Sequence, residues 1–433
     1  MVVFLCLLIF PSGQLNSYMR LIVIGGGAAG FFCAITAARL NPELEVLLME
    51  RSNKLLSKVR ISGGGRCNVT HACFEIEEIL SKYPRGRNFV KKTFHQFFTT
   101  DTIRWFEERG VKLKQEADGR MFPVSDSSET IIRCLLQEAS RYNVQILMHS
   151  DAKKITKEEH LWNIECGNGE SRSAEFVCVA SGGYPKAEMF SWLTALGHTV
   201  ETPVPSLFTF NLKNKRIAEL MGISVTANVR IRETKMEEEG PVLITHWGLS
   251  GPAVLRLSAR AARELAKLNY RFTVIVNWSP EYNESSVKQY FLDMRSKHGS
   301  AKIATKNDLG VPQRLWEWMC GLCEIERNVR WAELPASKQS VLARQVCAME
   351  LYVEGKTTFK EEFVTAGGIT LSEIDHNSMQ SKINGGLYFA GEILNVDGVT
   401  GGFNFQHAWT SGWIAGKNIA ERSRSVQLPR AST

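Results

Sequence analysis

A glycine-rich turn near the N-terminus constrains the fold more than any other feature of the chain. Residues 21–24 form a short apolar run, and the turn at 25–30 follows it and opens an apolar segment over 31–40. This order favours a strand, a glycine turn and a helix. A second apolar run at 44–49 ends at Glu50. The sequence therefore predicts one βαβ unit.

The spacing of the glycines in this turn predicts a nucleotide site. Gly25, Gly27 and Gly30 form the pattern Gly-x-Gly-x-x-Gly. In that pattern the first glycine permits a tight turn, the second lets the backbone approach a pyrophosphate, and the third lets the helix pack closely on the strand. Glu50 stands at the end of the second strand, where a carboxylate accepts hydrogen bonds from ribose hydroxyls. An acidic residue there favours an unphosphorylated ribose, hence FAD or NAD rather than NADP.

A run of three glycines follows soon after the βαβ unit. The segment 61–68 reads Ile-Ser-Gly-Gly-Gly-Arg-Cys-Asn, and successive glycines are unfavourable inside a helix or strand. We expect this backbone to lie close to a ligand, with Arg66 pairing with a phosphate and Asn68 bonding a flavin edge or capping the next turn. The cationic neighbour is expected to lower the pKa of Cys67. A flexible loop is the alternative.

A third signal lies near the C-terminus. Gly391 and Glu392 end an apolar run at 387–390, and the double glycine at 401–402 opens a helix expected over 404–420. This order places a second helix N-terminus at the carboxyl edge of the sheet, where its dipole suits the negative locus of a reduced flavin. A plain helix cap is the alternative.

Together these segments resemble the BaiN/YhiN-type flavoprotein family. The matching segments, in order, are 25–30, 62–68, 119–126 (Gly-Arg-Met-Phe-Pro-Val-Ser-Asp), 248–252 (Gly-Leu-Ser-Gly-Pro), 366–368 and 385–406. The resemblance spans about residues 19–423. It implies an α/β fold with a Rossmann-like FAD-binding domain of the GR2 type, carrying an inserted β-barrel and a helical region. It also implies an oxidoreductase activity, which in some family members is the reduction of conjugated carbon–carbon double bonds.

The motifs and the resemblance predict FAD as the cofactor and leave the catalytic acid or base unassigned. The predicted cofactor-binding residues are Gly25, Gly27, Ala28, Ala29, Gly30, Glu50, Arg51, Lys58, Ser62, Gly64, Arg66, Cys67, Asn68, Ala152, Ala180, Ser181, Gly182, Gly391, Glu392, Gly401, Gly402, Phe403, Asn404 and Phe405. No second Gly-x-Gly-x-x-Gly follows a strand, so NAD(P)H is expected only as a transient electron donor.

The changes of pattern along the chain predict an interrupted domain. We expect the FAD-binding domain over 19–200 and 361–425, with an insert over 201–360 between its two parts. The insert would hold a β-barrel at about 201–283 and 350–360 and helices at about 284–349. Residues 1–18 are interpreted as an untranslated or disordered extension, with Met19 as the true start, and 426–433 as a tail.

Composition sets broader limits. The 433 residues are 44% hydrophobic and 22% charged, which excludes a disordered, collagenous or disulfide-scaffold protein. Ten scattered cysteines favour a reducing compartment, so we expect a cytoplasmic protein. The pair Cys320 and Cys323 lies on one apolar helix face and is interpreted as core, so no metal site is expected. The apolar run at 1–10 is too short to span a membrane, and no membrane partner is expected.

A small-molecule substrate is the expected partner. The net charge of +7 is modest for this length, and the basic segment 82–92 is interpreted as solvated charge, so no nucleic acid is expected. Two alternatives stay open, a flavin-dependent RNA-modifying enzyme and a non-catalytic flavin sensor. The sequence does not indicate an oligomeric state.

Overall fold

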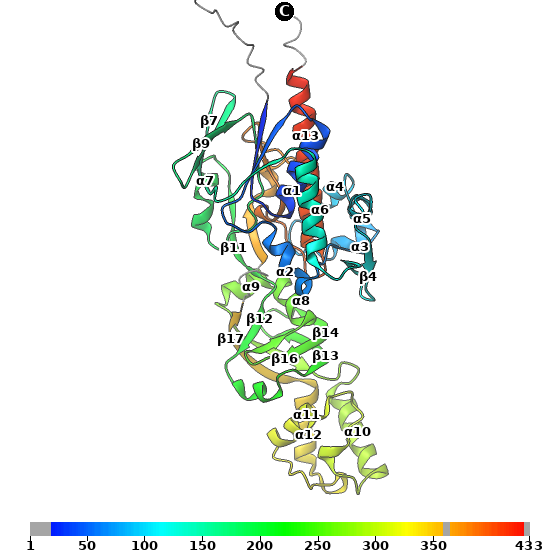
Figure 1. Ribbon diagram of the computed structural model, residues 1–433. Helices are drawn as coiled ribbons and strands as arrows, with labels where there is room; N and C mark the ends of the chain where they lie inside the picture. Colours follow the sequence, from blue (N-terminus) through cyan, green and yellow to red (C-terminus); the bar gives the residue numbers. More distant parts are fainter. Residues whose placement is uncertain (1–18, 358–363, 428–433) are drawn as a thin grey trace, which may run out of the picture.

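A five-stranded parallel sheet forms the centre of the part of the molecule drawn at the top of Figure 1. The computed structural model describes residues 19–357 and 364–427, so the expectations for 1–18 and for the tail fall outside the described residues. The strand order is β19-β10-β1-β2-β6. The strands are β1 (Arg20–Ile24), β2 (Glu45–Met49), β6 (Gln145–Leu147), β10 (Phe176–Val179) and β19 (Leu387–Phe389). Because β19 pairs with β10, the C-terminal part of the chain rejoins the sheet begun at the N-terminus.

Two helices from opposite ends of the chain pack side by side against this sheet. They are α1 (Ala28–Leu40) and α13 (Phe403–Gln427), and Figure 1 draws them next to each other with α6 (Ser128–Arg141). Glycine permits the close approach: a Cβ at Gly412 would lie 2.4 Å from the Ala29 carbonyl oxygen. The helix expected over 404–420 is thus confirmed, and it extends seven residues further.

Shorter elements surround the central sheet. Two three-stranded antiparallel sheets comprise β3 (Thr70–His71), β5 (Arg120–Pro123) and β4 (Leu113–Gln115), and β7 (Ala152–Glu158), β8 (Leu161–Cys166) and β9 (Ser171–Ala174). The remaining helices of this part are α2 (Ser57–Gly65), α3 (Ile76–Leu80), α4 (Arg87–Phe94), α5 (Thr99–Glu107) and α7 (Ser191–Thr194). Single 3-10 turns are η1 (Ala187–Phe190), η5 (Leu371–Glu373) and η6 (Gly391–Ile393).

The apolar pattern of residues 89–109 is divided between two separate helices, α4 and α5. The Asp101 carboxylate accepts a hydrogen bond from the Phe98 N–H (2.8 Å) and starts a new helix there. The apolar pattern continues across the break, since Phe94 and Phe98 both face the core. Hydrophobic periodicity alone therefore could not locate it.

A two-stranded antiparallel ribbon connects this part to the insert. It consists of β11 (Val200–Ser206) and β18 (Val364–Ile369). Beyond it lies a closed six-stranded barrel of order β12-β15-β14-β13-β16-β17. Its strands are β12 (Thr209–Leu212), β13 (Ser224–Ile231), β14 (Glu237–Ile244), β15 (Gly248–Ser250), β16 (Arg271–Asn277) and β17 (Met349–Thr357), with a 3-10 turn η2 (Lys215–Leu220). The helices α8 (Pro252–Arg260) and α9 (Ala262–Lys267) were not expected within the barrel segment.

Three helices form the tip of the insert, at the bottom of Figure 1. They are α10 (Glu284–Lys297), α11 (Gln313–Leu322) and α12 (Ala336–Cys347), with 3-10 turns η3 (Ile303–Thr305) and η4 (Trp331–Glu333). Trp316 and Trp331 are fully buried between them. Cys320 and Cys323 are buried in the same core, which confirms their interpretation as core residues.

The α/β fold with an inserted barrel and helical region is confirmed. Within 19–357 and 364–427, no helix is long and apolar enough to cross a membrane.

Candidate functional site

The three glycines of the first turn have different surroundings. A Cβ at Gly25 (φ +119°) would lie 2.3 Å from the Ala180 carbonyl oxygen, and one at Gly30 would lie 1.9 Å from the Gly25 carbonyl oxygen. Both glycines are therefore required by close packing of the backbone. A Cβ at Gly27 would have nothing within 4 Å. Gly27 leaves open space at the N-terminus of α1, where no side chain caps the helix and its first turn has no acidic residue.

The side chain of Glu50, at the end of β2, is fixed by hydrogen bonds from the glycine turn and from Ser52. One carboxylate oxygen accepts a hydrogen bond from the Gly26 N–H (3.0 Å), and the other accepts from the N–H and the hydroxyl of Ser52 (both 2.8 Å). A small pocket of about 40 Å³ lies beside it. Its lining residues are Ile24, Gly25, Met49, Glu50, Arg51, Ser150, Asp151, Ala152, Ser181 and Tyr184.

This pocket brings together five predicted residues from four separate segments: Gly25, Glu50, Arg51, Ala152 and Ser181. Sequence reasoning missed Ser150, Asp151 and Tyr184, although each lies within three residues of a predicted one. The pocket stands at the carboxyl ends of β1, β2 and β10, which is where open parallel sheets bind their ligands.

The glycine run at 63–65 leaves the helical path, as expected. Ser62 has an extended ψ of 147°, and the next three residues have φ of +60°, +71° and +84°. A Cβ at Gly64 or Gly65 would have nothing within 4 Å. This stretch therefore presents bare backbone to open space at the end of α2.

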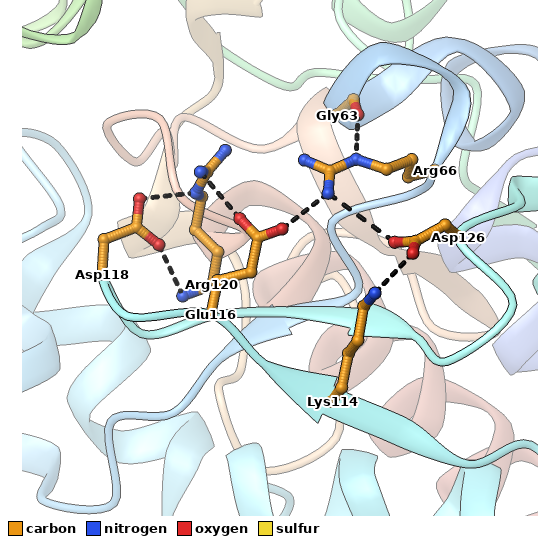
Figure 2. A network of polar contacts seen from close by, with 7 residues as sticks. All are labelled: Gly63, Arg66, Lys114, Glu116, Asp118, Arg120 and Asp126. Atoms are coloured by element: carbon orange, nitrogen blue, oxygen red, sulfur yellow. Dashed lines mark hydrogen bonds and ion pairs between the residues drawn. The ribbon is translucent and has the colours of Figure 1, made fainter.

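Arg66 has several partners within the protein. Figure 2 shows its guanidinium pairing with Glu116 (2.6 Å) and, at 3.7 Å, with Asp126. Its Nε donates to the Gly63 carbonyl oxygen (3.3 Å), and its planar end lies 4.0 Å from the centre of the Phe122 ring. Arg66 thereby fastens the glycine run to the β4–β5 hairpin.

The same network continues across the hairpin. Arg120 pairs with Glu116 (2.9 Å) and Asp118 (2.7 Å), and Lys114 pairs with Asp126. Three cations thus face three carboxylates in Figure 2. The positive charge of Arg66 is thus balanced by carboxylates of the protein, and its pairing with a phosphate stays a prediction.

Cys67 differs from the expectation for its thiol. The residue is fully buried, and burial raises its pKa to about 12. The expected lowering by Arg66 is wrong, because the Arg66 guanidinium points to the hairpin carboxylates. Cys67 is therefore a neutral thiol in a core position.

The segment after the glycine run meets the start of α13. The Asn68 side-chain oxygen accepts a hydrogen bond from the Gly402 N–H (3.0 Å), and its nitrogen donates to the Thr70 carbonyl oxygen (3.0 Å). Thr70 in turn donates to Gln406 (2.7 Å), a residue that was not predicted. A Cβ at Gly402 (φ +92°) would lie 2.7 Å from the Thr70 backbone. Asn68 therefore caps α13 from a position more than 330 residues earlier.

The other predicted residues at this helix start have internal partners. Phe403 is buried and stacks on His71 at 4.8 Å between ring centres, and Phe405 stacks on Trp409 at 5.6 Å. The Asn404 side chain bonds both the N–H and the carbonyl oxygen of Gly398 (2.8 and 2.9 Å). These three side chains shape the loop before α13.

Glu392 is fixed at the end of β19. Its carboxylate accepts hydrogen bonds from Lys58 (2.5 Å) and from the Thr365 N–H (2.9 Å). A Cβ at Gly391 (φ +77°) would lie 2.8 Å from the Ala29 side chain, so the end of β19 touches the first turn of α1. A Cβ at Gly182, after β10, would meet nothing within 4 Å. The ends of β10 and β19 and the first turn of α1 thus lie close together.

His407 lies in the first turns of α13 and is buried. Neither ring nitrogen has a hydrogen-bond partner among the described residues, and burial lowers the pKa of the ring to about 4. The ring is therefore neutral at pH 7.

Comparisons with known proteins agree with this geometry. A 3-dehydro-bile acid delta(4,6)-reductase of Clostridium scindens is 28% identical over 93% of this chain and 99% of its own. A ribosomal RNA dihydrouridine synthase of Escherichia coli is 29% identical over 92% of this chain and 97% of its own. A mutant of the FrdA chain of E. coli quinol fumarate reductase shares the fold, with a TM-score of 0.50 and 16% identity over 94% of this chain and 71% of its own.

The family model described as the HI0933-like protein Rossmann domain matches residues 19–418. That range covers both parts of the parallel sheet and the whole insert between them. The resemblance seen in the motifs is thereby confirmed. The chain belongs to the HI0933-like family.

Proposed function

We propose that this protein is an FAD-dependent oxidoreductase that reduces a carbon–carbon double bond conjugated with a carbonyl group. The observation that carries the proposal is the open space at Gly27, at the N-terminus of α1 and beside a fixed Glu50. A helix start without a cap or an acidic residue favours the pyrophosphate of a dinucleotide.

The residues at the carboxyl edge of the sheet fit FAD. Gly27 and the first turn of α1 would hold the pyrophosphate, and Glu50, beside the small pocket, would accept hydrogen bonds from the ribose hydroxyls of the adenosine. Glu392, positioned by Lys58, offers a carboxylate for the hydroxyl groups of the linking chain. The bare backbone at Gly64 and the start of α13 would border the flavin ring.

When bound, FAD supplies hydride transfer between an electron donor and an organic substrate. The chain positions the groups around it. Asn68 fixes the N-terminus of α13, whose dipole stabilises negative charge nearby. Burial keeps Cys67 a thiol and His407 uncharged at neutral pH, so neither adds a charge to this edge of the sheet.

The names of the relatives support this reaction class. A delta(4,6)-reductase of a 3-dehydro bile acid and a dihydrouridine synthase act on unlike molecules. Both names nevertheless describe hydrogen added across a double bond conjugated with a carbonyl, in a steroid ring or in the uracil ring. We therefore propose an activated double bond as the feature that the substrates share, with a small organic molecule as the substrate.

A uridine in RNA is the second candidate substrate. It is favoured by the two relatives named ribosomal RNA dihydrouridine synthase, from E. coli and Haemophilus influenzae, each 29% identical over more than nine-tenths of this chain.

One experiment tests the function and separates the two substrates. The purified protein is reduced anaerobically with NADH or NADPH and then mixed with a 3-oxo-4-ene steroid or a uridine-containing RNA. We expect reoxidation of the flavin by one of them, and a product that has gained two hydrogens by mass spectrometry. A flavin that is reoxidised only by oxygen would contradict the proposal and favour a sensor.

A further inference from the structure

A second cavity lies away from the predicted cofactor residues. It has a volume of about 510 Å³, within the range of small-molecule sites. One wall is the start of α4 with Gly86, Arg87 and Lys92, and the other is the segment 371–382 with His376 and Lys382. None of the residues proposed to hold FAD lines it.

The charged side chains that line this cavity are all basic. Arg87, Lys92 and Lys382 line it, no acidic residue does, and none of the three forms an ion pair with a described residue. The two acids of the neighbouring segment have other partners. Glu373 bonds His198 (3.0 Å), and Asp375 bonds Ser378 (2.7 Å).

Two further features reinforce the positive potential. No side chain caps the N-terminus of α4, and its first turn has no acidic residue, so its positive dipole end at Gly86 borders the cavity. The pKa of His376 is lowered, first by burial and then by the charges of Lys92 and Lys382. The charges of Lys92 and Lys382 are therefore both felt at His376, inside the cavity.

Both walls are fixed. Buried His198 joins the 371–382 segment through Glu373 and through Ser381 (3.0 Å). On the other wall, Arg85 pairs with buried Asp397 immediately before Gly86. The Gln96 side chain also donates to the His376 carbonyl oxygen (3.3 Å) and so links the two walls. The cavity is thus largely preformed, which reduces the entropic cost of binding.

We propose that this cavity, the basic pocket, binds the phosphate groups of a nucleotide-sized ligand through Arg87, Lys92 and Lys382. Lys382 also donates to the Ser372 carbonyl oxygen (2.8 Å), which positions its ammonium at the pocket. Cations without an acidic partner in a fixed pocket favour phosphate, and arginine bonds its oxygens in pairs. The apolar face of Phe89 and Ile374 would contact the rest of the ligand. Free nucleotides and the backbone of RNA share this phosphate chemistry.

Titration calorimetry tests the basic pocket. The probes are inorganic pyrophosphate, NADPH against NADH, and a short single-stranded RNA. The pocket variant carries Arg87→Gln, Lys92→Gln and Lys382→Gln. The matched control carries Arg133→Gln, Lys112→Gln and Lys235→Gln, which lose equal charge at exposed residues outside the pocket that form no ion pair with a described residue. Circular dichroism checks that both variants fold.

We expect at least one probe to bind the unaltered protein, with affinity that falls as salt rises. The pocket variant should bind it tenfold or more weakly, and the control should bind it nearly as well as the unaltered protein. Preference for NADPH or pyrophosphate would identify a free nucleotide, and binding of RNA alone would identify a phosphodiester. The proposal is overturned if no probe binds, or if both variants weaken binding equally. Because binding is measured directly, these outcomes do not depend on FAD or turnover.

Discussion

At the residue scale, the space around each glycine of the first turn separates a structural role from a binding role. Gly27 has φ −97°, which any residue adopts, and open space where its Cβ would lie. Gly30 has no room for a Cβ at all. The same sequence pattern therefore contains one position with space for a ligand and one where the fold itself requires glycine.

Gly27→Val should abolish FAD binding with little loss of stability, because its side chain would occupy the space proposed for the pyrophosphate. Gly30→Val is the contrasting variant, and overlap with the Gly25 backbone should prevent folding or lower the stability of the protein severely. Flavin absorbance per protein and thermal unfolding measure the two effects. A yellow Gly27→Val protein with full occupancy would refute the assignment.

His407 makes stability depend on pH. Its pKa falls from the usual 6.5 to about 4 on folding, because burial disfavours the charged ring. The unfolded chain then binds a proton below pH 6.5 that the folded chain does not bind until about pH 4. This residue should therefore lower the free energy of unfolding as pH falls through that window, by about 3 kcal/mol in total.

The measurement is chemical denaturation between pH 4 and pH 7. His407→Leu should show a weaker fall in stability over that window than the unaltered protein, whatever its stability at pH 7. Equal slopes for the two proteins would show that the ring titrates normally.

Residue identity alone could not predict the chemistry of Arg66 and Cys67. The carboxylates that balance Arg66 come from the hairpin at 113–126, about fifty residues away in the sequence. Cys67 is fully buried, which its neighbours in the sequence do not indicate. The glycine motifs were easier to interpret, because their spacing reflects local backbone requirements.

At the element scale, the contact between β3 and α13 defines one border of the proposed flavin site. Asn68 bonds the N–H of Gly402, the residue immediately before α13. Both segments were expected near the flavin from their composition, and the structure brings Asn68 and Gly402 within hydrogen-bond distance. The proximity of either to the flavin ring stays a prediction.

Asn68→Ala should remove the cap of α13 and lower stability by about 1 kcal/mol. Since the same change alters the helix terminus, we also expect a shift in the flavin absorption spectrum and reduction potential. Asn68→Asp keeps an acceptor for the Gly402 N–H and should restore most of the stability. A full loss of stability in both variants, with unchanged spectra, would indicate a packing role only.

Local signals predicted the elements of the central sheet well and failed where the chain turns without a change in hydrophobic pattern. The break between α4 and α5 depends on Asp101, and α8 begins at Pro252 after Gly251 with φ +95°. The basic pocket was not predicted, because its walls lie almost 300 residues apart in the sequence. The basic segment 82–92 was identified, but its partner wall was not.

At the scale of the whole molecule, one buried ion pair joins three parts of the chain. Asp397 is fully buried and pairs with Arg85, whose guanidinium also donates to the Ala259 carbonyl oxygen (2.7 Å). Ser206, at the end of β11, donates to the same carboxylate (3.1 Å). Burial raises the pKa of Asp397, and Arg85 opposes that rise. The pair thus connects the loop before α13 to the insert.

Arg85→Met should lower the free energy of unfolding by about 3–5 kcal/mol, because it leaves a buried carboxylate unpaired. The double variant Arg85→Met, Asp397→Leu removes the unpaired charge and should recover part of that loss. Denaturant unfolding of the single and double variants measures the loss of stability and its recovery. A double variant no more stable than the single one would mean that packing, not charge, accounts for the effect.

The flavin content of the purified protein tests the central claim most directly. Heat-released cofactor, separated by chromatography and quantified against protein, should be FAD at about one molecule per chain, or should reach that ratio after FAD is added. A properly folded protein that neither carries FAD nor binds added FAD would contradict the account.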